Sequence, residues 1–145
     1  MGNLWIAANY GFLQLEDKEL RDVGYYWPDK LVRSYEMMLA PENESQSFWY
    51  TIDGEGIYRV QDTIHTLFSS KNGFEGLITM GLLRDKNGYV WTGSYAGLEM
   101  WNGKEWCYMT QREGLGGQTV YLLTQDVDGN LWAGTEQGVT KIILG

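Results

Sequence analysis

Residues 126–139 read DVDGNLWAGTEQGV, and this pattern recurs along the chain at nearly equal steps. Residues 85–98 read DKNGYVWTGSYAGL, and residues 2–12 read GNLWIAANYGF. The tryptophans that mark the pattern are 44, 42 and 41 residues apart: Trp5, Trp49, Trp91 and Trp132. A period of about 40 to 45 residues made of short strands is typical of propeller blades. The sequence therefore predicts an all-β chain of β-propeller blades.

The third repeat shows how one blade is built. Its four apolar runs are rich in β-branched and aromatic residues and are separated by turn signals such as Asn-Gly (77–83, 89–94, 98–101 and 105–109). Four antiparallel strands make one blade. The first repeat lacks a first strand and the last repeat lacks a fourth. We therefore expect about four repeats of three, four, four and three strands, 14 in all, with incomplete first and last blades.

The chain is long enough for one domain over residues 1–145, which we interpret as a partial or small propeller. The repeats divide it at about 1–28, 29–70, 71–112 and 113–145. The second repeat is the least regular. Its segment 29–40 also fits a short amphipathic helix, although comparison with the other repeats favours strand.

Packing and turn geometry explain the residues of the motif. Gly88 and Gly129 suit the positive φ of a tight hairpin, and the preceding aspartates can cap that hairpin through side-chain bonds to the backbone (Asp85 and Asp126). Each tryptophan ring is expected to fill space between adjacent blades. The glycines two residues further on are expected to make room for a neighbouring ring (Gly93 and Gly134).

The formal net charge of −8 argues against a nucleic-acid or anionic-membrane partner, because both need clustered Lys and Arg. No apolar run approaches the length of a membrane helix. The single cysteine, Cys107, is interpreted as a small hydrophobic residue within a strand. The single histidine, His65, is interpreted as an ordinary strand residue. The pair Asp126 and Asp128 lacks the further ligands of a calcium loop. We therefore expect no catalytic residue, no metal site and no cofactor.

The motif also resembles a known repeat. Residues 126–139 match, almost position for position, the two-component regulator propeller repeat, whose consensus runs roughly Asp-x-x-Gly-Asn-Leu-Trp-x-Gly-Thr-x-x-Gly-Leu. Residues 85–98 match nearly as well, and residues 49–57 are the weakest match. The resemblance covers essentially the whole chain.

The resemblance implies a function. In that family such repeats form the sensor part, usually periplasmic, of bacterial hybrid histidine kinases, and many of these sense glycan fragments. A non-catalytic ligand-sensing or binding module, for a glycan or a peptide, is the expectation that follows. The sequence shows no kinase, DNA-binding or membrane segment, and the compartment is periplasmic only if the resemblance holds.

The turns between second and third strands share one face of a propeller with the loops between blades. On this face we expect the ligand-binding residues Asn9, Tyr10, Trp27, Tyr95, Glu136 and Gln137. Further loop residues expected there are Glu55, Tyr25, Tyr26, Asn72, Phe74, Arg112 and Glu113. Their aromatic and amide groups suit a neutral glycan or a peptide.

Two alternatives remain open. The first is a propeller fragment that self-associates or joins further propeller repeats, because an open blade edge invites pairing with another chain. The second is a remnant of a propeller lyase or glycoside hydrolase. A single histidine leaves little from which to assemble a lyase site, and no carboxylate pair stands out for glycoside cleavage.

Overall fold

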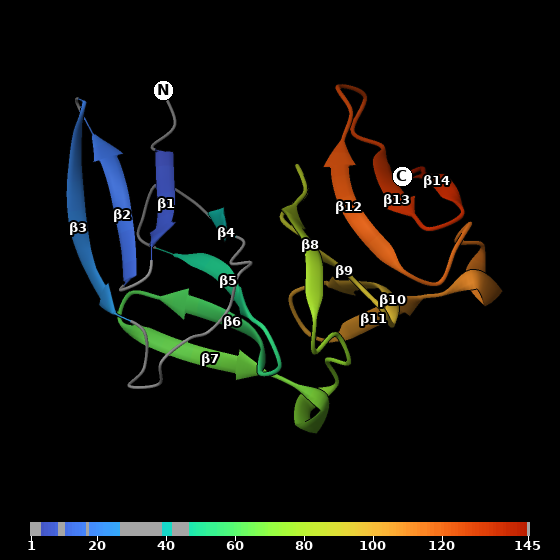
Figure 1. Ribbon diagram of the computed structural model, residues 1–145, viewed down its shortest axis with the longest axis horizontal. Coiled ribbons are helices and arrows are strands. Elements are labelled where there is room, and N and C mark those ends of the chain that lie inside the picture. Colours follow the sequence, from blue (N-terminus) through green and yellow to red (C-terminus); the bar gives the residue numbers. More distant parts are fainter. Residues whose placement is uncertain (1–3, 9–10, 17, 27–38, 42–46, 145) are drawn as a thin grey trace.

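The computed structural model describes residues 4–8, 11–16, 18–26, 39–41 and 47–144. These residues form 14 strands in four antiparallel sheets of three, four, four and three strands, so the predicted all-β fold and strand count are confirmed. The first two sheets lie on the left of Figure 1 and the last two on the right.

Each sheet follows the chain from its inner to its outer edge. The first consists of β1 (Leu4–Ala8), β2 (Gly11–Glu16) and β3 (Glu19–Tyr26). The second consists of β4 (Leu39–Pro41), β5 (Phe48–Ile52), β6 (Gly56–Gln61) and β7 (Ile64–Phe68). The third consists of β8 (Thr79–Arg84), β9 (Val90–Ser94), β10 (Gly97–Trp101) and β11 (Trp106–Met109). The fourth consists of β12 (Val120–Gln125), β13 (Leu131–Thr135) and β14 (Gly138–Ile142).

Short 3₁₀ turns, η1 (Ser70–Asn72) and η2 (Gln111–Glu113), lead into the loops between the later sheets. The inner strands contact one another in series, β1 with β4, β4 with β8 and β8 with β12. Of the irregular segment 29–40, only its end enters a described strand, β4, and the rest lies outside the described residues.

Aromatic rings fill the space between the second and third sheets. Trp49 is fully buried and stacks on Phe68, with ring centroids 5.4 Å apart, and Trp106 meets it edge-on at 6.2 Å. Phe74, from the loop between the sheets, lies in the same cluster and is fully buried. The prediction that Phe74 belongs to an exposed binding face is therefore wrong, because its ring serves as core. Tyr25 and Tyr26, predicted in a loop, have their backbone in β3.

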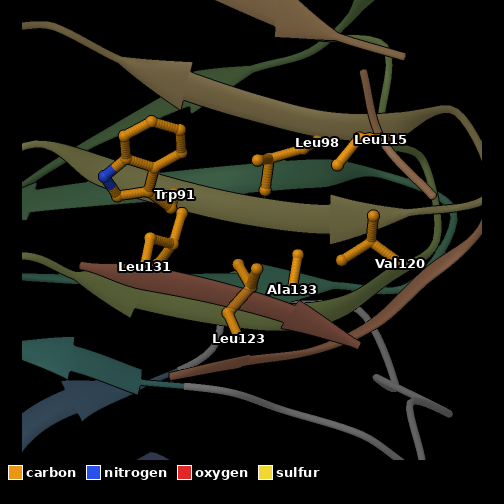
Figure 2. Packing of buried hydrophobic residues seen from close by; sticks show 7 residues of the cluster. All are labelled: Trp91, Leu98, Leu115, Val120, Leu123, Leu131 and Ala133. Carbon is orange, nitrogen blue, oxygen red and sulfur yellow. The ribbon is translucent and has the colours of Figure 1, made fainter. Parts of the chain in front are cut away.

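Aliphatic side chains fill the next interface. Trp91 of β9 belongs to a cluster of seven buried residues that also contains Val120 and Leu123 of β12 (Figure 2). The predicted position of this tryptophan between blades is confirmed. The neighbour of Gly93, however, is not a ring: a Cβ at this glycine would lie 2.5 Å from Cγ1 of Val120. The glycine admits the inner strand of the next blade.

In two repeats the motif aspartate precedes the tryptophan by six residues, and a hydrogen bond explains this spacing. Asp85 Oδ1 accepts hydrogen bonds from the backbone N of Asn87 and Tyr89, as predicted for a hairpin cap. Its Oδ2 also accepts from Nε1 of Trp91 at 2.8 Å. Asp126 repeats this bond to Trp132 at 2.9 Å. One carboxylate thus fixes both the hairpin, where Gly88 and Gly129 have φ of 88° and 87°, and the tryptophan ring of the same repeat. Of these two rings, that of Trp91 packs between blades.

Candidate functional site

Three of the six predicted binding residues are described, and they occupy equivalent turns. Tyr95 lies between β9 and β10, and Glu136 and Gln137 lie between β13 and β14. Both turns end in a glycine with positive φ, 117° at Gly97 and 126° at Gly138. The other three, Asn9, Tyr10 and Trp27, lie outside the described residues.

The Glu136 side chain is used to hold the neighbouring loop. Its Oε1 accepts a hydrogen bond from the backbone N of Gln118, and its Oε2 accepts from the backbone N of Thr119, both at 2.8 Å. Desolvation acts to raise the pKa of Glu136, but the backbone hydrogen bonds outweigh it and hold the pKa below its ordinary value. Gln137 follows it with an exposed side chain.

Tyr95 borders an open depression of about 280 Å³. Its ring is 58% exposed. The loop that precedes β8 forms the opposite wall, and the complete lining is Glu75, Leu77, Ile78, Ser94, Tyr95 and Ala96. The depression therefore combines a phenol ring and aliphatic surface with one exposed carboxylate.

A second, larger depression of about 520 Å³ lies at the next loop between blades. Hydroxyl, amide, guanidinium and carboxylate groups line it: Tyr108, Thr110, Gln111, Arg112, Glu113 and Gln118. Thr110 and Glu113 form a reciprocal cap that fixes the shape of η2. The Tyr108 hydroxyl donates to the carbonyl O of Gly73, which ties this wall to the preceding loop.

Gln118 joins the two depressions. Its Nε2 lies within hydrogen-bonding distance of the carbonyl O of Tyr95 and of Ala96, at 3.5 and 3.4 Å. The turn at Tyr95, the turn at Glu136 and the loop 110–119 thus meet on one face. The sequence predicted that these turns and loops share one face. It did not predict that Gln118, Tyr108 and Glu75 belong to this face, because nothing in their spacing marks them.

No group of three or more His, Cys, Asp or Glu that could hold a metal ion is found within the described ranges. His65 lies in β7, as expected, and its Nδ1 is 3.0 Å from the Tyr50 hydroxyl. Cys107 is a free thiol in β11. None of the described helices is long and apolar enough to cross a membrane.

Comparison with known proteins agrees with this fold. Among solved structures, the chain is similar to the extracellular domain of BT4673 from B. thetaiotaomicron, in two structures that describe it as a one-component and as a hybrid two-component system. The TM-scores are 0.69 and 0.68, with 14% and 19% identity, over 99% of this chain. The extracellular domain of a hybrid two-component system, BT3049 of the same organism, matches with a TM-score of 0.52 and 13% identity over 99% of the chain.

These similarities cover only part of the larger proteins. The chain spans 20%, 23% and 26% of the three solved chains. No curated protein matches the sequence. The family model described as "Two component regulator propeller" matches residues 114–137. The predicted resemblance is thereby confirmed: residues 114–137 match the repeat of the two-component regulator propeller family.

Proposed function

We propose that this chain is a ligand-binding part of a sensor propeller and that it binds a carbohydrate on the face formed by Tyr95 and the loop 110–119. The observation that carries the proposal is the 520 Å³ depression lined by hydrogen-bonding groups, joined through Gln118 to the exposed ring of Tyr95. A sugar offers hydroxyls to such groups and an apolar ring face to an aromatic side chain. Gln137, Asn9, Tyr10 and Trp27 are proposed to extend this surface, and Glu136 to shape it.

Replacing Tyr95 with alanine is expected to weaken binding of an oligosaccharide at least tenfold, because the side chain provides the exposed aromatic surface. Gln118→Ala should weaken it as well, through loss of the link to the Tyr95 turn. The measurement is titration calorimetry with oligosaccharides first selected on a glycan array. Neither variant should change the melting temperature much, since both side chains are exposed.

Tyr89→Ala is the matched control. Tyr89 is also exposed, at 40%, but it precedes β9, at the opposite end of this strand from Tyr95. The Tyr89→Ala variant should bind the oligosaccharide with the same affinity as the natural chain. Loss of binding in all three variants, or binding only to peptides on a parallel peptide array, would overturn the carbohydrate assignment.

The same comparison supports a proposal for the location and the partners. The similar structures are extracellular domains, which supports a periplasmic or extracellular location for this chain, to be tested by fractionating the source cells. The similar chains are also four to five times longer. We propose that this chain works within a larger propeller, as a non-catalytic module.

An exposed apolar face on the last sheet supports the proposal that a further blade packs there. Leu98 of the third sheet is 1% exposed beneath the fourth, whereas its equivalent Val139 is 68% exposed. Gly81 of β8 lies against Leu123 of the next sheet. Leu122 of β12 occupies the same repeat position as Gly81, and its side chain is exposed. The face around Val139 thus repeats an interface that β12 covers one blade earlier, and the inner strand of a further blade is the occupant that fits.

Raising the concentration of the 145-residue chain is expected to drive self-association through this face, because burying apolar surface favours it. Sedimentation velocity should show a larger species that the double variant Leu122→Glu, Val139→Glu abolishes. Tyr89→Glu, exposed elsewhere, should leave it unchanged. If the natural chain stays monomeric yet binds an apolar dye, the face is exposed but does not pair with a second copy, as expected if further repeats of a longer protein cover it. A monomer that binds no dye would contradict the docking face.

A further inference from the structure

A strand of the third sheet carries a buried carboxylate that the proposed binding face does not use directly. Glu99 lies in the middle of β10 and is 1% exposed. Its strand neighbours are Thr92 of β9 on one side and Tyr108 of β11 on the other. Its Oε1 accepts a hydrogen bond from the backbone N of Glu75 at 2.8 Å. Its Oε2 is buried and has no hydrogen-bond partner among the described residues.

The next repeat shows what this position does. Thr140 of β14 is the equivalent of Glu99, and its Oγ1 accepts from the backbone N of Gly116 at 2.8 Å. Gly116 is the equivalent of Glu75 in the following loop. In both blades, therefore, the third strand holds the loop that precedes the inner strand. In the fourth sheet the acceptor is the neutral hydroxyl of Thr140, and in the third sheet it is the ionisable carboxyl group of Glu99.

The loop held by Glu99 is one wall of the depression beside Tyr95. Glu75, Leu77 and Ile78 line that depression. The loop is also tied by the backbone N of Gly54, which donates to the carbonyl O of Leu77 at 2.8 Å. Gly76 leaves room for the carboxyl group, because a Cβ at this position would lie 2.6 Å from Oε2 of Glu99. The carboxyl group is thus hydrogen-bonded to this loop at Glu75 and lies close to it at Gly76.

We propose that Glu99 is a positioning residue for the loop 74–78, and that gain or loss of its proton shifts this loop and so reshapes the depression beside Tyr95. The inference rests on the proposed function in that it assigns a regulation to the same face. The ionised carboxylate has a second oxygen that needs hydrogen-bond donors, and the Gly76 segment of the loop lies close to that oxygen.

The surroundings place the titration near neutral pH. Burial raises the pKa of Glu99 to about 7, although the nearby backbone amides of Glu75 and Gly76 act to lower it. The nearby Glu75 charge raises it further, and the Tyr108 phenol on β11 is the other titratable group beside it. No lysine or arginine among the described residues forms an ion pair with it.

The test follows backbone amides by two-dimensional NMR between pH 5 and 9, without any ligand. In the natural chain the amides of Glu75 and Gly76, and those of Leu77, Tyr95 and Ala96, should shift with one midpoint near 7. The side-chain carboxyl carbon of Glu99 should titrate with the same midpoint. In Glu99→Gln, which keeps the shape and the acceptor oxygen, that midpoint should disappear.

Glu136→Gln is the matched control, because this carboxylate also holds a loop but is exposed and has a lowered pKa. It should leave the midpoint unchanged. A midpoint that persists in Glu99→Gln would assign the titration to another group, such as His65, and overturn the proposal. A titration confined to Glu75 and Gly76 would overturn the coupling to the depression. Failure to bind any sugar would count against the proposed function alone.

Discussion

Replacing Gly93 with alanine will lower the free energy of unfolding by about 3 kcal/mol, the upper part of the range for overpacking a core. The added Cβ would lie 2.5 Å from Cγ1 of Val120 and 2.9 Å from its carbonyl O. The second of these is backbone, so no side-chain rotation relieves the contact. Since β12 is the inner strand of the next blade, the whole interface would have to separate. Urea denaturation followed by circular dichroism measures the effect.

Gly134→Ala is the matched control at the equivalent position. There the nearest atom to an added Cβ is Cβ of Leu122 at 3.5 Å, an ordinary contact within the same sheet. This variant should differ from the natural chain by less than about 1 kcal/mol. Equal effects at the two glycines would show that Gly93 does not mark a blade interface. In a longer protein with a further blade on this sheet, Gly134→Ala should become as costly as Gly93→Ala.

Trp49→Ala is the second large effect, with an expected loss of about 4 kcal/mol. The ring is fully buried and contacts Phe68, Trp101 and Trp106, and the guanidinium of Arg59 lies 5.4 Å from its centroid. Removing it leaves a cavity between the second and third sheets, where the remaining rings cannot close the gap without moving two blades. The same denaturation experiment measures it.

Trp132→Ala tests the same residue type at the same place in the motif. Trp132 is half-buried, with the Lys141 ammonium 5.2 Å from its ring centroid. Because no further blade covers it among the described residues, its loss should cost less than about 2 kcal/mol. A larger loss at Trp132 than at Trp49 would contradict the assignment of Trp49 as the centre of a blade interface.

The sequence predicted the strands and turns well because both depend on local patterns. Alternating apolar residues and turn pairs such as Asp128-Gly129 act within a few residues, and they led to 14 strands in sheets of three, four, four and three. The capping role of Asp85 also followed from its place before the hairpin. The spacing of six residues from Asp85 to Trp91 could have revealed the bond between them, since Asp126 and Trp132 repeat it.

Predictions about neighbours in other blades were less successful. Phe74 was expected on a binding face but is core, because the loop that carries it turns inward beside Trp106. Gly93 was expected to face a ring but faces Val120. Each error concerns which side chain meets which across two sheets. That choice depends on the angle and offset between blades, which no local pattern encodes.

The sequence alone thus determined the fold class, the number of strands, the tight turns and the family resemblance, because a repeated local pattern is visible wherever it occurs. Only the tertiary structure decided that Gln118 joins two depressions, that the Val139 face is uncovered, and that Glu99 is buried against the loop 74–78. These features arise where residues far apart in the chain meet. The free energy of such contacts, and the pKa of a buried carboxyl group, depend on the surroundings that the packed blades create.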